Sequence, residues 1–465
     1  MKKYYLAIDI GASGGRHILG HLENGKMILE EVHRFPNGNV ERDGELIWDI
    51  DALFAEVITG MKKCNALGKI PVSVGIDTWA VDFVLLDEND KRIGNAVGYR
   101  DSGTYGMDEE VYRTISLDDL YARTGIQKQI FNTIYQLMAW KKHKADLFEK
   151  AKTMLMIPDY LHFLLSGVKV TEYTNATTMQ LVSPVTKDWD YELTEMLGYP
   201  REIFQKLVLP GTCLGTLTEE VRRMVGYDCK VVVPATHDTA SAVLAVPAKA
   251  GKDFLYISSG TWSLMGTELL KADCSTESCA YNLTNEGGYD YRFRYLKNIM
   301  GLWMIQSVRK EIGQNYSYGE ICEMAARCEI NSLVDVNAAC FLAPKNMTEE
   351  IKKACQETGQ RVPETLAEVA SVIYRSLAHC YGKTIKEIEQ LTGKKFDGIH
   401  IVGGGSNAEY LNKLTAKATG LPVYAGPTEA TAIGNLSAQM ISGGEWNDLW
   451  DARSCIYDSF DIKVY

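Results

Sequence analysis

The sequence predicts an α/β protein of two related domains, each a mixed sheet flanked by helices. Three observations lead to this fold class. The chain has 465 residues, and a single hydrophobic core stops growing at roughly 250 to 300 residues. Strand patterns alternate with long helical patterns along the chain. The motif of residues 5–13, an apolar strand entering a turn of small residues, returns as residues 254–262, which indicates an internal duplication.

Composition limits the class of partner. Hydrophobic residues make up 46% and charged residues 23%, as in ordinary globular proteins. The net charge of −11 repels polyanions, so we expect no nucleic-acid partner. Because neither a secretory signal nor an apolar run of about 18 residues is found, we expect a cytoplasmic protein without membrane contact, as a monomer or homodimer. Eleven cysteines without a C-x-x-C pair predict reduced, buried thiols.

The first elements follow from turn and periodicity signals. Residues 4–34 read as an antiparallel meander, strand, glycine turn, strand, hairpin and strand, and the hairpin contains Asn24-Gly25, which supplies the positive φ that a two-residue turn needs. Apolar residues then recur on one helical face over 50–61, and Asp49 or Asp51 can cap the helix start. A β pattern resumes over 72–77 and 83–87.

The repeated motif divides the chain. Residues 253–266 repeat the strand, turn, strand layout of the N-terminus, after a linker-like segment at 246–251. We therefore predict an N-terminal domain of residues 1–247 and a C-terminal domain of residues 248–465.

A glycine cluster in the second half predicts a nucleotide site. After a long helical pattern at 366–391 comes a buried strand at 399–402, and then Gly403-Gly404-Gly405 opens a predicted helix that runs to about Thr419. Glycines let the backbone approach a ligand closely, and a helix N-terminus offers free N–H groups. The alternative is an ordinary turn, which would need only one glycine.

Asp9 predicts a magnesium and phosphate site. It lies within an apolar strand, and a turn of small residues up to Arg16 follows. Mg²⁺ keeps several waters and takes one or two carboxylates, so Asp9 could hold the hydrated ion while the turn and Arg16 contact phosphate oxygens. The alternative is an ordinary hairpin with a surface aspartate, but an aspartate in an apolar strand is costly to bury without a partner.

His237 and Asp238 lie where an apolar strand, residues 231–233, is followed by a helix of small residues. A carboxylate at the start of a helix stays ionised at neutral pH and can accept the proton of an attacking hydroxyl. The alternative for Asp238 is a simple N-cap. His237 alone would more often be a packing residue.

These motifs together resemble a known family, the sugar kinases named for their Phe-Gly-Gly-Tyr signature, a branch of the actin/Hsp70-like ATPases. The resemblance covers nearly the whole chain. It rests on seven blocks in the family's order, which are residues 9–16, 75–79, 81–87, 99–102, 236–243, 258–266 and 426–435.

The resemblance implies a duplicated ATPase fold of two ribonuclease H-like domains with a central cleft, with ATP and a small sugar as the partners. It makes Asp238 the catalytic base. The ATP-binding residues it implies are Ala12, Ser13, Gly14, Gly15, Arg16, Thr261, Gln306, Gly403, Gly404 and Gly405. The sugar-binding residues it implies are His237, Thr239 and Asn298, with Trp79, Ala80, Asp82 and Arg100 as weaker candidates. Trp79 could equally be a core residue.

Within the family the chain is most similar to the branch that phosphorylates L-rhamnulose at its 1-hydroxyl. It departs from that branch at three places. Ala80 stands where the branch typically has Gly, Ser13-Gly14 replaces Ser-Ser, and Gly103 replaces an expected Arg. Because Ala80 adds a methyl group at a sugar-lining position, it bears on which sugar fits.

Three other functions are compatible with parts of this pattern. One is a kinase for another ketose or polyol, such as fuculose, xylulose or glycerol. Another is a chaperone-like or filament-forming ATPase, since fold alone does not decide function. The last is a dinucleotide-dependent oxidoreductase, but residues 403–406 lack the full G-x-G-x-x-G spacing. In a kinase, we expect sugar binding to close the domains and exclude water.

Overall fold

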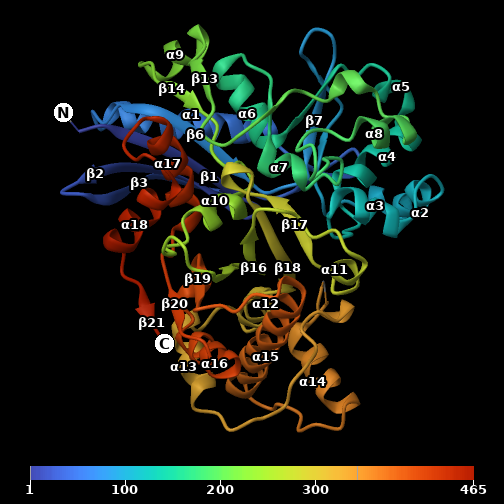
Figure 1. Ribbon diagram of the computed structural model, residues 1–465, viewed down its shortest axis with the longest axis vertical. Coiled ribbons are helices and arrows are strands. Elements are labelled where there is room, and N and C mark those ends of the chain that lie inside the picture. Colours follow the sequence, from blue (N-terminus) through green and yellow to red (C-terminus); the bar gives the residue numbers. More distant parts are fainter. Residues whose placement is uncertain (1, 343) are drawn as a thin grey trace. The chain divides into compact units, whose positions relative to one another are not determined.

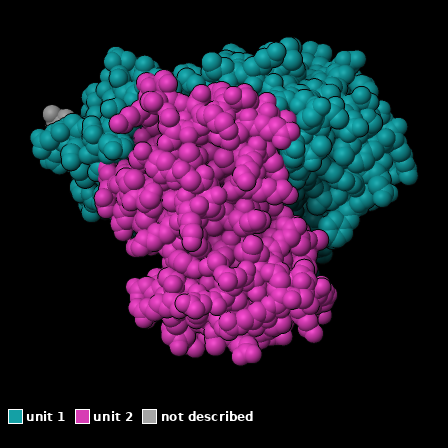
Figure 2. Space-filling model, turned by 60° about the horizontal axis from the view of Figure 1, so that its bottom comes forward, with its two compact units in different colours: residues 1–245, 269–295, 431–459 teal, residues 246–268, 296–430, 460–465 magenta. Residues whose placement is uncertain are grey.

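The computed structural model describes residues 2–342 and 344–465 (Figure 1). The chain forms two compact units, which Figure 2 distinguishes by colour. Unit 1 contains the residues up to Ala245 together with 269–295 and 431–459. Unit 2 contains 246–268, 296–430 and 460–465. The chain therefore leaves unit 1 after Ala245 and returns to it twice.

The main sheet of unit 1 has six strands in the order β13-β14-β6-β1-β2-β3. β1 is parallel to β6 and antiparallel to β2, which is antiparallel to β3. This confirms the predicted meander at the N-terminus. The strands are β1 (Tyr4–Gly11), β2 (Gly14–Glu23), β3 (Lys26–Pro36), β6 (Pro71–Thr78), β13 (Cys213–Thr216) and β14 (Lys230–Val232).

The predicted hairpin and the predicted helix of residues 50–61 are both present in unit 1. Asn24 and Gly25 join β2 to β3 with φ values of 52° and 77°, the positive values of a tight hairpin turn. Helix α1 (Ile50–Ala66) begins after Asp49, whose side chain accepts a hydrogen bond from the Ala52 N–H at 3.1 Å.

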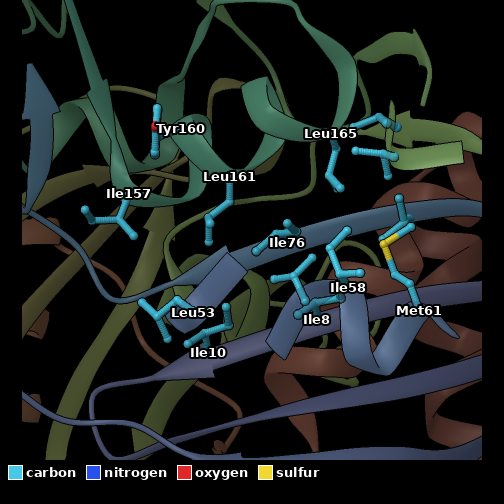
Figure 3. Close-up of a cluster of buried hydrophobic side chains, with 14 of the residues drawn as sticks. Ile8, Ile10, Leu53, Ile58, Met61, Ile76, Ile157, Tyr160, Leu161 and Leu165 are labelled. Carbon is cyan, nitrogen blue, oxygen red and sulfur yellow. The ribbon is translucent and has the colours of Figure 1, made fainter. Parts of the chain in front are cut away.

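Helices cover both faces of this sheet. On one face, α1 and α6 (Ile157–Ser166) pack against alternate residues of β1 and β6, as Figure 3 shows for Ile8, Ile76, Met61 and Leu161. On the other face lie α10 (Asp238–Leu244), α17 (Ala430–Ser442) and α18 (Leu449–Ser459). A Cβ atom on Gly434 of α17 would lie 1.8 Å from a carbonyl oxygen of α10, so glycine permits the close packing of these two helices.

The rest of unit 1 contains three small sheets, and a second hydrophobic core lies around one of them, β10-β7-β8. Their strands are β4 (Val40–Arg42), β5 (Glu45–Trp48), β7 (Phe83–Leu86), β8 (Arg92–Ile93), β9 (Ala96–Val97), β10 (Thr153–Met156), β11 (Thr171–Glu172) and β12 (Leu207–Val208); β17 (Thr284–Gly287) is also in unit 1. The helices are α2 (Met107–Tyr112), α3 (Leu117–Thr124), α4 (Thr133–His143), α5 (Ala145–Phe148), α7 (Tyr173–Thr177), α8 (Tyr191–Met196), α9 (Glu219–Val225) and α11 (Thr276–Ala280).

The sheet of unit 2 repeats the strand order of unit 1. Its strands follow the order β18-β16-β15-β19-β20-β21, in which β15 is antiparallel to β16 and parallel to β19. The strands are β15 (Leu255–Ser259), β16 (Trp262–Leu269), β18 (Phe293–Met300), β19 (Ile399–Val402), β20 (Val423–Ala425) and β21 (Lys463–Val464). The helices are α12 (Trp303–Glu311), α13 (Tyr318–Ala326), α14 (Met347–Glu357), α15 (Leu366–Thr392) and α16 (Glu409–Thr419).

Two further expectations can be compared with the structure. None of the helices in the described part of the chain is long and apolar enough to span a bilayer. All eleven cysteines are free thiols, as predicted. The expectation that they are buried is wrong for Cys213 and Cys340, which are exposed.

Candidate active site

Two aspartates lie side by side at the ends of parallel strands of unit 1. Asp9 of β1 is in register with Asp77 of β6. Side chains alternate across a sheet, and Ile8, Ile10 and Ile76 belong to the core on one face. Both carboxylates therefore project to the opposite face.

The two carboxylates have different partners. Arg16 Nη2 donates to Asp9 Oδ2 at 2.8 Å, across the β1–β2 pair. Asn435 Nδ2, from α17, donates to Asp77 Oδ2 at 2.6 Å. Asp77 Oδ1 is buried and has no hydrogen-bond partner among the described residues. Burial raises the pKa of Asp77 well above its usual value, and the charges of Asp9 and Asp238 raise it further.

Asp238 joins this pair from the loop after β14. The Thr78 N–H at the end of β6 donates to the Thr236 carbonyl at 2.9 Å, which places the start of α10 beside Asp77. Asp238 is the first residue of α10, and the N-cap is His237. The alternative of Asp238 as a simple N-cap is therefore wrong.

The Asp238 carboxylate is partly exposed, and the contacts described for it involve one oxygen. Its Oδ1 accepts hydrogen bonds from the Thr239 N–H at 2.6 Å and from Thr239 Oγ1 at 3.1 Å. Loss of surrounding water and the charge of Asp9 raise the pKa of Asp238 to about 6. At neutral pH this carboxyl group is mostly ionised, yet it is basic enough to accept a proton.

His237 contacts a buried ion pair that the sequence analysis does not identify. Its Nδ1 lies 2.9 Å from Arg294 Nη2 and 3.4 Å from Glu286 Oε2. Arg294 and Glu286 are themselves 2.9 Å apart. Burial lowers the pKa of His237 well below its usual value, and the charge of Arg294 lowers it further.

Asp82, a predicted sugar-binding residue, is buried and accepts hydrogen bonds from two tryptophans. It is 1% exposed, and its Oδ2 accepts hydrogen bonds from Trp48 Nε1 at 2.6 Å, Trp79 Nε1 at 2.9 Å and the Tyr99 N–H at 3.1 Å. Gln136 Nε2 donates to Oδ1 at 3.0 Å. Trp79 packs on Trp48 within the core, so its core role is confirmed and any sugar contact stays a prediction.

The loop after Trp79 has an unusual backbone. Val81 has a φ of 67°, which is rare for a β-branched residue. Its carbonyl accepts a hydrogen bond from Thr133 Oγ1 at 2.6 Å, so α4 holds the loop in this conformation. Ala80 is partly exposed and does not have a positive φ. An alanine is therefore compatible with the backbone conformation at this position, and its methyl group is partly exposed to solvent.

The predicted phosphate turn is shorter than expected. Only Ala12 and Ser13 form the turn, while Gly14, Gly15 and Arg16 belong to β2 and pair with the end of β1. The segment is thus a tight hairpin and not an open loop of backbone N–H groups. Most of its predicted phosphate ligands are strand residues.

Unit 2 brings together the other predicted ATP-binding residues. Thr261 lies in the turn between β15 and β16, and its Oγ1 is 3.5 Å from Gln306 Oε1 of α12. A Cβ atom on Gly403 would lie 3.0 Å from the Ser259 carbonyl oxygen, and one on Gly405 would lie 1.9 Å from Ser259 Oγ. These glycines therefore let the chain pack directly on the end of β15.

The glycine cluster and Asn298 both lie in unit 2. The glycines do not open an α-helix directly, because a 3₁₀ turn at Gly404–Asn407 intervenes and α16 begins at Glu409. Asn298, a predicted sugar ligand, lies on β18 in unit 2 and is partly exposed. The other predicted sugar-binding residues belong to unit 1.

Among Asp77, Glu286 and Arg294, only Asp77 has a recognisable sequence signal. Asp77, like Asp9, is an aspartate inside an apolar strand pattern. For Glu286 and Arg294 no comparable signal exists, because they contact His237 only through the return of residues 269–295 to unit 1.

Comparison with known proteins identifies the family. Residues 4–245 match the N-terminal domain and residues 255–443 the C-terminal domain of the FGGY family of carbohydrate kinases. A protein named rhamnulokinase from Halalkalibacterium halodurans is 54% identical over 462 residues, covering 99% of this chain and 98% of that protein. Another of that name, from Bacillus subtilis, is 44% identical over 465 residues, covering 99% and 95%.

Solved structures confirm the predicted fold. A ligand-bound xylulose kinase from Lactobacillus acidophilus superposes with a TM-score of 0.80 at 16% identity, covering 100% of this chain and 93% of that one. Glycerol kinase from Plasmodium falciparum, with ADP, gives 0.78 at 14% identity, covering 99% and 94%. The two family domains and the full-length relatives show that this chain belongs to the FGGY family of carbohydrate kinases.

Proposed function

We propose that this chain transfers the γ-phosphoryl group of ATP to the 1-hydroxyl of L-rhamnulose. The observation that carries the proposal is the full-length similarity, at 54% and 50% identity, to two relatives named rhamnulokinase. Membership of a carbohydrate kinase family argues against the chaperone-like ATPase and the oxidoreductase. Kinases for fuculose, xylulose or glycerol remain the alternatives to test.

Asp238 is the proposed general base. A sugar hydroxyl is a weak nucleophile, and its proton must be accepted as its oxygen bonds to phosphorus. Thr239 donates twice to Oδ1, so we assign proton acceptance to Oδ2. His237 and Thr239 lie beside the base and are suited to hold the sugar.

The carboxylate cluster suits a hydrated magnesium ion. Asp9, Asp77 and Asp238 repel one another, and a cation would offset this repulsion. No group of three or more His, Cys, Asp or Glu side chains in residues 2–342 and 344–465 is arranged to hold a metal ion directly. Mg²⁺ keeps several of its waters and takes only one or two carboxylates, so we propose Asp9 as its contact, through water. Magnesium bound with ATP would neutralise phosphate charge.

We assign most of the sugar contacts and the base to the N-terminal domain, and the nucleotide mainly to the C-terminal domain. Thr261, Gln306 and the glycines from Gly403 to Gly405 support the second assignment, because they converge at the end of β15. Positioning and charge stabilisation supply most of the catalysis in phosphoryl transfer. The protein would therefore act mainly by holding its two substrates.

The test is ADP release measured with a panel of acceptors. L-rhamnulose should give a kcat/KM at least about tenfold above fuculose, xylulose and glycerol, because buried polar groups that match one set of hydroxyls reject others. A reaction without sugar measures background ATP hydrolysis, and analysis of the product locates the phosphate. Equal rates with another acceptor, or phosphate at another position, would contradict the proposed substrate.

A further inference from the structure

The contact between His237 and Arg294 determines where the imidazole carries its proton. Arg294 Nη2 lies 2.9 Å from Nδ1 of His237. An arginine side chain has only donors and keeps its charge. Nδ1 must therefore be the acceptor, which excludes the imidazolium form and leaves the hydrogen of the neutral ring on Nε2.

Arg294 is held by contacts of its Nε and Nη2 atoms, while its buried Nη1 has no hydrogen-bond partner among the described residues. Its side chain is fully buried, its Nε donates to the Gly287 carbonyl at 2.8 Å, and Glu286 Oε2 lies 2.9 Å from Nη2. Burying such a pair is costly and seldom improves stability over apolar residues of similar size. A role in orienting His237 gives a reason for its presence.

The second ring nitrogen of His237, Nε2, lies on the side of the proposed base. Nε2 of His237 lies 3.5 Å from Asp238 Oδ1, beyond the usual 2.7–3.2 Å of an N–H···O hydrogen bond. The backbone N–H of His237 donates to Thr174 Oγ1 at 3.4 Å, which fixes the residue from a third direction. An Nε2–H group would therefore be available to a sugar hydroxyl beside Asp238, the position that the proposed base requires.

We propose that Glu286 and Arg294 are positioning residues that keep His237 neutral with its proton on Nε2, so that His237 donates a hydrogen bond to the sugar while Asp238 alone accepts the proton. This inference deepens the proposed function and rests on Asp238 as the base. The lowered pKa of His237 agrees with a neutral ring at physiological pH. The charged groups around the ring are Glu286, Arg294 and Asp238.

The first experiment needs neither sugar nor activity. The chain has eight histidines, so long-range ¹⁵N–¹H spectra of ¹⁵N-histidine-labelled protein give eight ring patterns, and His237→Gln identifies the one from residue 237. We expect a neutral ring protonated on Nε2 from pH 8 down to pH 6. A ring protonated on Nδ1, or an imidazolium at pH 7, would overturn the inference even if the rhamnulose kinase assignment holds.

The second experiment removes the positioning pair. The double variant Glu286→Gln with Arg294→Met removes both buried charges, so neither is left unpaired. We expect kcat/KM for the sugar to fall roughly 10- to 100-fold, by analogy with the loss of groups that orient metal-ligating histidines, with the KM for ATP unchanged.

The matched control is Arg292→Met, because Arg292 lies in the same segment with its guanidinium over Trp450. It should retain the wild-type values. A double variant with normal sugar kinetics, or an equal loss in the control, would refute the role. If rhamnulose is not the acceptor, the spectra of the first experiment still test the ring independently.

Discussion

Asp9 and Asp77 show how far single residues could be predicted. An aspartate inside an apolar strand indicates a buried carboxylate that needs a partner or a ligand. For this reason the sequence predicts a magnesium and phosphate site at Asp9. The same reasoning applies to Asp77, but the parallel register that brings it beside Asp9 depends on two strands about 70 residues apart. Side-chain pairing of that kind has no signature within either strand.

Asp238→Asn should abolish transfer to the sugar while leaving both substrates bound. Asparagine has nearly the same shape but cannot accept the proton, and loss of a general base costs roughly 10² to 10⁴ in rate. Because His237 is the N-cap of α10, the melting temperature should change little. Sugar-dependent ADP release, sugar affinity and thermal unfolding together test this expectation.

The pH profile gives the same prediction a second readout. With the pKa of Asp238 near 6, the carboxylate is ionised above that pH and protonated below it, so wild-type kcat/KM should fall by about tenfold per pH unit on the acid side. Asp146→Asn, an exposed aspartate in the first turn of α5, is the matched control. Near-normal turnover of Asp238→Asn, or a loss explained by unfolding, removes Asp238 from the mechanism.

Hydrophobic periodicity and turn residues predict those helices, strands and turns that are determined by neighbouring residues in the sequence. The hairpin at Asn24-Gly25, helix α1, helix α15 and strand β19 lie where turn residues and apolar spacing placed them. The glycine cluster does not predict the 3₁₀ turn at Gly404–Asn407, because Gly403 and Gly405 are needed for close packing on Ser259, whereas a Cβ atom on Gly404 would meet nothing within 4 Å. The sequence shows that glycines are present but not which neighbour requires them.

Ala80→Gly should change sugar affinity, leave ATP affinity nearly unchanged and lower stability only by the entropy of an added glycine. The loop from Trp79 to Asp82 is held by the Asp82 hydrogen bonds and by Thr133 of α4, so the methyl group of Ala80 is not needed for its shape. Added backbone entropy should cost about 0.5–1 kcal/mol. The measurements are the KM for sugar, the KM for ATP and thermal unfolding.

Ala338→Gly, at a partly exposed loop position in unit 2, controls for the entropy of an added glycine. It should lower stability by a similar amount and leave the sugar KM alone. If Ala80→Gly leaves the sugar KM unchanged, or changes the ATP KM by the same factor, Ala80 does not line the sugar site.

For the whole molecule, the predicted duplication agrees with the two strand orders. β13-β14-β6-β1-β2-β3 in unit 1 corresponds strand for strand to β21-β20-β19-β15-β16-β18, with β1 matching β15. Each unit also places a long helix, α1 or α15, before the central parallel strand. One short motif was enough to predict the duplication, because it covers β1 and β15, each of which pairs with both a parallel and an antiparallel neighbour in its sheet.

The way the chain completes unit 1 could not be predicted. Residues 431–459 belong to unit 1, although residues up to 443 match the family's C-terminal domain. The contacts responsible are buried side-chain hydrogen bonds between residues more than 350 positions apart. Gln439 Nε2 donates to the Leu6 carbonyl at 2.9 Å, and Gln439 Oε1 accepts from Ser73 Oγ at 2.6 Å.

Gln439→Leu should therefore destabilise unit 1 although it lies near the end of the chain. Leucine removes these two hydrogen bonds and a third, which Gln439 Nε2 donates to Asn435 Oδ1 at 2.7 Å. Each buried polar group that is left without a partner costs about 1–3 kcal/mol. Gln356→Leu, the same change at an exposed position on α14 of unit 2, is the control. Thermal unfolding should show a lower midpoint for Gln439→Leu and a wild-type midpoint for Gln356→Leu. Equal midpoints for the two variants would mean that the hydrogen bonds of Gln439 add little to the stability of unit 1.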